Sequence, residues 1–363
     1  MLSQKLLESQ DINMKKIPVI KVVGVGGAGG NAINRMIDAG VHGVEFIAVN
    51  TDVAVLQTSK APIKIQIGAE LTKGLGAGGD PKIAEKAALE SEEIIREYLQ
   101  GADMVFITAG MGGGTGTGAS PVIADIAREC ADLVVAVVTL PFSFELRKKR
   151  ATAKEGVERL KEKVDSVIII NNDKLLQLSD RNLPVLEAFK LADDVLRQAV
   201  QGVSEIVNGT GIINIDFNDL KSIMSKAGTA YLGIGVGKGE NRAKEAAKMA
   251  LNSPILDISI NGAKGVIFNI TCGKDFNMNE INELAEMIIQ NADPEANVKF
   301  GLVANDEMEG AMKVTIVATG FEQNEVFKEV NKKEIEQNYA HLVGDFELPP
   351  FLLKQQNNPK DKR

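Results

Sequence analysis

The sequence predicts an α/β protein: a Rossmann-like domain with a parallel sheet, then a long connecting helix, then a smaller α+β domain. Three observations support this. Apolar strands alternate with helical patterns through the first half of the chain, and helical spacing of apolar residues continues from Pro184 to Val207 for about six turns. Shorter strands and helices then alternate up to Gly320.

Composition narrows the classes of protein that the chain can belong to. Its 363 residues suffice for about two domains, and the net charge of −8 argues against nucleic acid as the main partner. With only Cys130 and Cys272, we expect no disulfide framework and a reducing compartment. The start of the chain lacks a signal-peptide core, and no apolar run is long enough for a bilayer. We therefore expect a cytoplasmic protein without direct membrane insertion.

The first glycine loop follows a predicted strand over Ile17 to Val23. Gly24, Gly26 and Gly29 fit the spacing G-x-G-x-x-G, and a helix over Ala32 to Ala39 and a strand over Val44 to Val49 come next. Alone, this spacing is a weak signal, since a dinucleotide-binding turn and a tight packing turn both show it.

A second loop, Gly110 to Gly118, contains six glycines and two threonines. It lies between a predicted buried strand, Asp103 to Ala109, and a predicted helix, Ala119 to Cys130. Backbone N–H groups and the positive end of a helix dipole converge at such a junction, so this loop predicts a phosphate cradle. A third glycine-rich segment, Gly74 to Asp80, is either a free surface loop or a loop over the ligand. We expect Asp80 to cap a helix over Pro81 to Leu99.

Polar residues follow the next two predicted strands. Leu133 to Thr139 leads to Glu145 and to four cations, Arg147 to Arg150, which form either a solvated helix start or a contact to ribose and phosphate. Val167 to Ile170 leads to Asn171, Asn172 and Asp173, at the sheet edge where open α/β sheets bind ligands.

Two residues of the long helix, Phe189 and Asp193, share a face. In one interpretation Phe189 is a core residue and Asp193 a solvated one. In the other, both contact a guanine base, and the Asp193 carboxylate accepts hydrogen bonds from its N1–H and its exocyclic amine. After the helix, Asn214, Asp216 and Asp219 place three polar groups on one turn, where Asp219 by itself predicts an N-cap for a helix over Leu220 to Ala227.

The second domain and the tail complete the chain. We expect strands over Tyr231 to Val236, Gly265 to Thr271, Asn297 to Val303 and Met312 to Thr319, and helices over Asn241 to Leu251 and Asn279 to Ala292. No cluster of metal-binding side chains stands out. The tail carries Phe346, Leu348 and Phe351 to Leu353, which favour a docking peptide over an idle disordered end.

Taken together, these motifs closely resemble the FtsZ family, the bacterial cell-division GTPases of the tubulin superfamily. The resemblance runs from about Val19 to Gly320, and Gly112 to Gly118 matches the superfamily's nucleotide signature. It implies the tubulin/FtsZ fold, bound GTP or GDP, and Mg²⁺ with the nucleotide. The implied domains are a tail (1–17), a GTP-binding domain (18–183), the central helix (184–209), a GTPase-activating domain (210–320), a linker (321–344) and a partner-binding tail (345–363).

The resemblance also implies the site residues. Contacts to GTP are implied for Gly27, Ala28, Gly29, Gly30 and Asn31, for Gly114, Thr115 and Gly116, and for Glu145, Asn172, Phe189 and Asp193, with Asn31 and Asp193 on guanine. One position departs from the family pattern: Leu146 stands where the family has glycine, and Lys149 stands where it has the arginine that contacts the nucleotide. A lysine keeps the charge without the planar fork.

Asn214, Asp216 and Asp219 match the family loop that enters the next subunit's nucleotide site, which replaces the capping interpretation of Asp219 with a catalytic one. The implied partners are copies of the same chain, head to tail in a filament, and division proteins and membrane tethers bound through Leu348 to Gln356, at the division site near the inner face of the membrane. Two alternatives stay open: an NAD-dependent oxidoreductase that uses the first glycine loop, and a non-catalytic nucleotide-binding scaffold.

Overall fold

A computed structural model describes residues 17–178, 184–209, 211–253, 256 and 258–321. The predicted partner-binding tail, with Leu348 to Gln356, lies outside these residues, as do nearly all of the predicted linker and of the N-terminal tail. None of the helices that the structure describes is long and apolar enough to cross a bilayer.

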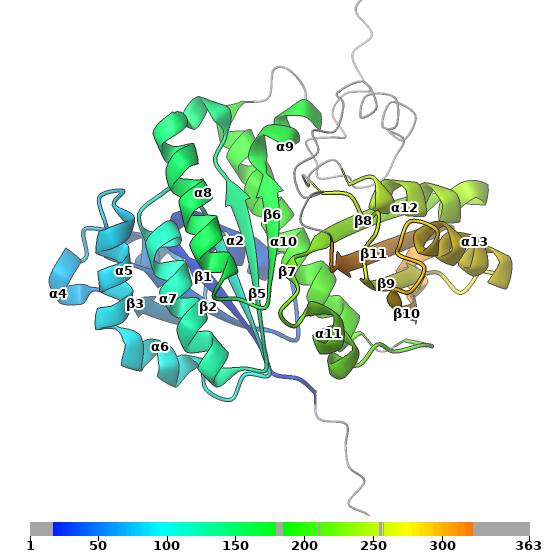
Figure 1. The fold of residues 1–363 in the computed structure, drawn as a ribbon, viewed down its shortest axis with the longest axis horizontal. Helices are drawn as coiled ribbons and strands as arrows, with labels where there is room; N and C mark the ends of the chain where they lie inside the picture. The colour runs from blue at the N-terminus through cyan, green and yellow to red at the C-terminus, as the bar shows by residue number, and fades with distance from the viewer. Residues whose placement is uncertain (1–16, 179–183, 210, 254–255, 257, 322–363) are drawn as a thin grey trace, which may run out of the picture.

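The first sheet has seven parallel strands in the order β3-β2-β1-β4-β5-β6-β7 (Figure 1). The strands are β1 (Ile20–Val25), β2 (Glu45–Asn50), β3 (Ile63–Gln66), β4 (Met104–Gly110), β5 (Leu133–Leu140), β6 (Ser166–Asn171) and β7 (Gly228–Thr229). This confirms the predicted parallel sheet. The chain passes from β1 to β2 and β3 on one side, and returns at β4, next to β1, to build the other side.

Helices cover both faces of this sheet, and the alternation of side chains along each strand feeds two cores. In β5, Val135 and Val137 belong to the core under α2 (Gly26–Asp38), whereas Val134 and Ala136 belong to the opposite core. The opposite core is closed by α5 (Pro81–Glu90), α6 (Glu92–Leu99), α7 (Thr115–Cys130) and α8 (Arg147–Lys161). Smaller helices are α3 (Val53–Thr58), α4 (Ala69–Thr72), η1 (Ser143–Glu145) and α9 (Asn172–Leu178).

The long helix α10 (Val185–Asn208) lies between the first sheet and the second part of the fold (Figure 1). Its apolar face shares one continuous core with α2 and with residues of the second sheet. That sheet has the order β10-β9-β11-β8, with β9 and β10 parallel and β11 antiparallel to β9 and β8. The remaining elements are α11 (Phe217–Met224), β8 (Tyr231–Lys238), η2 (Gly239–Asn241), α12 (Arg242–Leu251), β9 (Gly265–Cys272), α13 (Met278–Ile289), β10 (Asn297–Ala304), η3 (Asp306–Met308) and β11 (Ala311–Thr319).

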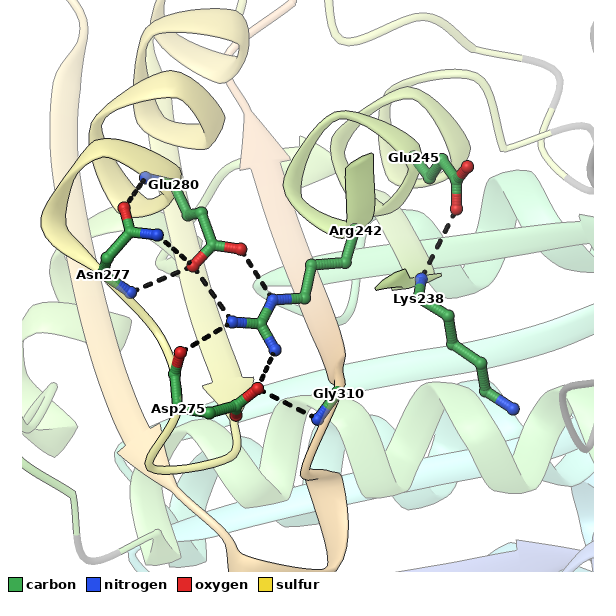
Figure 2. Close-up of polar contacts among 7 residues, drawn as sticks. All are labelled: Lys238, Arg242, Glu245, Asp275, Asn277, Glu280 and Gly310. Carbon is green, nitrogen blue, oxygen red and sulfur yellow. Dashed lines mark hydrogen bonds and ion pairs between the residues drawn. The ribbon is translucent and has the colours of Figure 1, made fainter. Parts of the chain in front are cut away.

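A buried guanidinium ties the outer helices of this second part together (Figure 2). Arg242, at the start of α12, donates to Glu280 on α13 (Nε to Oε1, 2.7 Å) and to Asp275 (Nη1 to Oδ2, 2.5 Å). Asp275 also accepts from the backbone N–H of Gly310, just before β11. The guanidinium lowers the pKa of both carboxyls, so the cluster is held as an ion-paired network.

The structure changes three predicted helices. The helix expected over Pro81 to Leu99 is two helices, α5 and α6, because Ser91 bends the chain and its hydroxyl accepts from Gly68 N at 3.1 Å. Helix α2 begins at Gly26, six residues before the expected start, because tertiary packing outweighs the poor helix propensity of glycine. Asp219 is not an N-cap: Asp216 is the N-cap of α11, and Asp219 is its third helical residue.

Candidate nucleotide site

The two glycine loops meet at the point where the strand order of the first sheet reverses. β1 and β4 are neighbours, and the loops follow their carboxyl ends directly. A Cβ added to Gly26 would lie 3.0 Å from Gly116 N, and one added to Gly110 would lie 2.7 Å from the Cβ of Ala28. Ligands of open α/β sheets bind in the crevice at such a switch point.

Both loops end in helix starts that leave N–H groups for an anion. Val25 and Gly114 are the N-cap residues of α2 and α7, and neither residue type has a polar side-chain atom to cap the first turn. The first turns carry no acidic residue either. Since the first N–H groups of a helix have no partner within it, the two helix starts together form an anion-binding surface.

Space for a ligand lies over this surface. A Cβ added to Gly27, Gly30 or Gly113 would meet no atom within 4 Å. Two hydrogen bonds fix the loops beneath: Thr51 and Thr115 join their hydroxyls at 2.8 Å, and Gly112 N donates to Thr117 Oγ1 at 2.8 Å. The two glycine loops therefore lie next to each other, and Gly27, Gly30 and Gly113 border open space.

The third glycine segment lies against the second loop. A Cβ added to Gly114 would lie 3.0 Å from the Cβ of Ala77 and 3.2 Å from the backbone of Gly79, and Ala77 is buried. Asp80 caps α5 through Lys82 N, as predicted. This placement favours the phosphate side of the site over a free surface loop.

Phe189, predicted to contact the base, lies on α10, and Asn172, predicted to contact GTP, follows β6 directly. The ring of Phe189 packs edge-on against the rings of Phe142 and Phe144, with ring centroids 5.4 and 6.1 Å apart. Phe189 stays partly exposed. Asn172 is buried, and its side-chain oxygen has no hydrogen-bond partner in the described part of the chain. An unpaired buried acceptor beside an exposed aromatic face suits a ligand that donates hydrogen bonds.

Asp193 is not the solvated residue that one of the two interpretations expected. Only 13% of its side chain is exposed, and burial raises its pKa to about 6. The positive charge of Arg35, whose Nε lies 3.8 Å from Asp193 Oδ2, acts in the opposite direction. Arg35 was not predicted from the sequence. It lies four residues after Asn31 on α2, so both residues share the face of α2 that looks toward Asp193.

Two of the four cations after Glu145 form ion pairs, one of them with Glu145 itself. The Glu145 carboxylate accepts from Phe142 N and from Lys149 Nζ at 2.8 Å, and Arg150 pairs with Asp173 at 3.3 Å. Lys149 also passes close to the second loop, because a Cβ on Gly112 would lie 2.8 Å from its carbonyl oxygen. Glu145 and Lys149 thus form an ion pair close to the second loop.

The acidic turn lies at the other end of the molecule. Asp216 and Asp219 form a reciprocal capping box at the start of α11, in which Asp219 N donates to Asp216 Oδ1 at 2.8 Å. Asn214 accepts from Gly211 N, and Lys299 pairs with Asp219 Oδ1 at 2.9 Å. In Figure 1, α11 lies at the lower end of the molecule and α9 at the upper end.

Helix α10 sets the separation of the two sites. Phe189, near its start, packs on residues that follow β5, whereas Asn208, at its end, donates to Gly43 just before β2. The 24 residues of α10 span about 36 Å. The acidic turn therefore cannot reach the glycine loops of its own chain.

The described residues hold no group of three or more His, Cys, Asp or Glu side chains that could bind a metal ion. Mg²⁺ commonly keeps several waters and is held by substrate phosphates with few protein ligands. The hydroxyls of Thr51 and Thr115, beside the second loop, fit that limited role.

Comparison with known proteins identifies the family. Residues 19–180 match the GTPase domain of the Tubulin/FtsZ family, and residues 228–322 match the C-terminal domain of the FtsZ family. An FtsZ dimer from M. jannaschii is 42% identical with a TM-score of 0.81, covering 91% of this chain and 98% of that one. A mutant form of FtsZ from M. jannaschii is 44% identical with a TM-score of 0.79, covering 88% and 95%.

CetZ2 from Haloferax volcanii, solved as a protofilament with GTPγS, shares the fold at 19% identity, with a TM-score of 0.72 over 89% of this chain and 98% of that one. One family model matches each part of the fold, and both M. jannaschii relatives are more than 40% identical over nearly their full length. All of these matches indicate the same family. The chain belongs to the Tubulin/FtsZ family and is a GTPase of the FtsZ type.

Proposed function

We propose that this GTPase assembles head to tail, so that the acidic turn of one subunit completes the nucleotide site of the next. The observation that carries the proposal is the length of α10, about 36 Å, which separates the predicted base-binding residues near its start from the acidic turn that follows its end. A contact between two different faces is heterologous and does not close, so it builds a filament. The 42% identical FtsZ relative, which was solved as a dimer, supports self-association.

In this proposal each predicted residue has one task. Backbone N–H groups of Gly27 to Gly30 and of Gly114 to Gly116 hold the phosphates, with Lys149 beside them. Glu145 accepts from the ribose, while Asn31, Asn172, Phe189 and Asp193 hold guanine. Mg²⁺ bound to the nucleotide would neutralise charge on the phosphates.

The hydrolytic step needs the second subunit. Asp216 and Asp219 orient a water whose oxygen bonds to the γ-phosphorus while the bond to the β–γ bridging oxygen breaks. The products are GDP and inorganic phosphate, and the water proton leaves with phosphate or solvent. Asn214 supports the turn that carries both carboxylates, because its side chain accepts from Gly211 N.

We extend the proposal to the cell by analogy with the family. The filaments would form the cytokinetic ring at the division site, and Leu348 to Gln356 would bind division proteins and membrane tethers. Because the relatives above come from M. jannaschii and Haloferax volcanii, we do not restrict this role to bacteria. The domain boundaries given from the sequence belong to the same proposal.

The test is GTP turnover per subunit measured over a range of protein concentrations, with light scattering in the same samples. Turnover and scattering should rise together in GTP and stay low in GDP. Asp219→Ala should bind GTP but release little phosphate. Turnover per subunit that does not depend on concentration would refute the shared site. The match to a GTPase domain favours GTP over the NAD alternative, and hydrolysis over the alternative of a non-catalytic scaffold.

A further inference from the structure

We propose that Lys299 is a catalytic residue supplied in trans: in the filament its ammonium group moves from Asp219 to the γ-phosphate of the neighbouring subunit's GTP. The inference rests on the proposed head-to-tail site. It adds a side chain from β10, which neither the glycine loops nor the acidic turn contains.

The position of Lys299 carries the argument. Its Nζ lies 2.9 Å from Asp219 Oδ1. A water that Asp219 orients would lie at hydrogen-bond distance from the carboxylate, which puts the ammonium within about 6 Å of that water. An attacking water lies about 3 to 3.5 Å from the phosphorus, so the flexible lysine stem can bring Nζ to a γ-phosphate oxygen.

The ion pair is not needed to hold the acidic turn. Backbone hydrogen bonds join Ile212 and Ile213 to Leu302 at 2.7 to 3.1 Å, and the capping box with Asp216 fixes Asp219 from its own helix. The side chains of Lys299 and Asp219 are 40% and 28% exposed. Ion pairs this exposed contribute little to stability, so a polyanionic phosphate can readily replace the carboxylate as partner.

The nucleotide side leaves this task open. Neither glycine loop contains the lysine of the G-x-x-x-x-G-K phosphate loop. The cations after β5, among them Lys149 and Arg150, belong to the subunit that binds the nucleotide, so their charge is present before assembly. A positive charge that arrives only with the next subunit would stabilise the charge developing on the γ-phosphate, as an arginine finger does in other GTPases.

The experiment measures phosphate release per assembled subunit for Lys299→Met, Lys299→Arg and Lys221→Met, with the assembled fraction taken from sedimentation. Lys221 is the matched control, because it is a lysine of similar exposure on α11 that pairs with Asp132, directly before β5, and not with a carboxylate of the acidic turn. We expect Lys299→Met to lower the rate at least tenfold, Lys299→Arg to keep most of it, and Lys221→Met to leave it unchanged.

A Lys299→Met rate equal to that of the unaltered protein would overturn the inference, and so would a higher rate, which would mean that the ion pair restrains Asp219. A lysine on an edge strand can also act only to discourage aggregation. In that case Lys299→Met would aggregate in GDP and keep an unchanged rate of phosphate release per assembled subunit, and this outcome would also overturn the inference.

If Lys299→Met does not assemble alone, phosphate release is measured in filaments that mix the variant with unaltered subunits. The rate should then fall in proportion to the fraction of variant, and a rate independent of that fraction would overturn the inference. Failure of the shared site itself appears separately, as concentration-independent turnover in the unaltered protein.

Discussion

Leu146 departs from the family's sequence pattern, and the structure gives the departure a measurable cost. The residue adopts φ 76° and ψ 154°, a combination that glycine takes readily and residues with a Cβ avoid, at a cost on the order of 1 to 3 kcal/mol. Its side chain is 73% exposed, so Leu146→Gly gives up only about 0.5 kcal/mol of burial. Glycine's extra freedom in the unfolded chain costs about 0.5 to 1 kcal/mol. The net expectation is a stabilisation of about 1 kcal/mol.

Urea and thermal unfolding measure this difference. A gain of about 1 kcal/mol should raise the midpoint by about 2 to 4 °C. Leu146→Ala is the matched control: it removes the same exposed side chain but keeps the Cβ, so it should leave the protein no more stable than before. If Leu146→Ala stabilises as much as Leu146→Gly, or if Leu146→Gly destabilises, backbone strain at this position is refuted.

Two further expectations follow from ionisable groups. Because burial raises the pKa of Asp193 to about 6, its carboxylate protonates as the pH falls, and GTP affinity should drop about fourfold between about pH 7.5 and 5.5. Fluorescent-nucleotide titration should show this drop in Asp194→Asn and not in Asp193→Asn; equal pH profiles for the two variants would contradict it. Arg242→Met should lower the thermal midpoint. Arg242 lowers the pKa of Asp275 and Glu280, so its contribution to stability is fully present above their usual pKa near 4. That contribution is lost as the pH falls through the lowered pKa values. The difference in thermal midpoint between the unaltered protein and Arg242→Met should therefore narrow in acid. A gap that stays constant in acid would refute that account.

Where sequence reasoning went wrong, the deciding contacts were distant in the chain. The helix start at Gly26 depends on packing against β4: a Cβ on Gly29 would lie 2.3 Å from Thr108 O, so glycine is required there, whatever its propensity. The break at Ser91 depends on a hydrogen bond from Gly68. The edge strand β3 was not predicted, because its four residues carry too short a pattern to distinguish from a loop.

By itself the sequence determined the local chemistry: the strand, glycine-loop and helix junctions, the periodicity of α10, and the acidic residues of one turn, because each depends on neighbours within a few residues. Only the tertiary structure decided which of these groups share a site. The pairing of β1 with β4 brings the two glycine loops together, and the length of α10 keeps Asp216 and Asp219 away from them. The partners of Asp193 and Asp219, Arg35 and Lys299, come from elements distant in the chain, and no spacing in the sequence relates them.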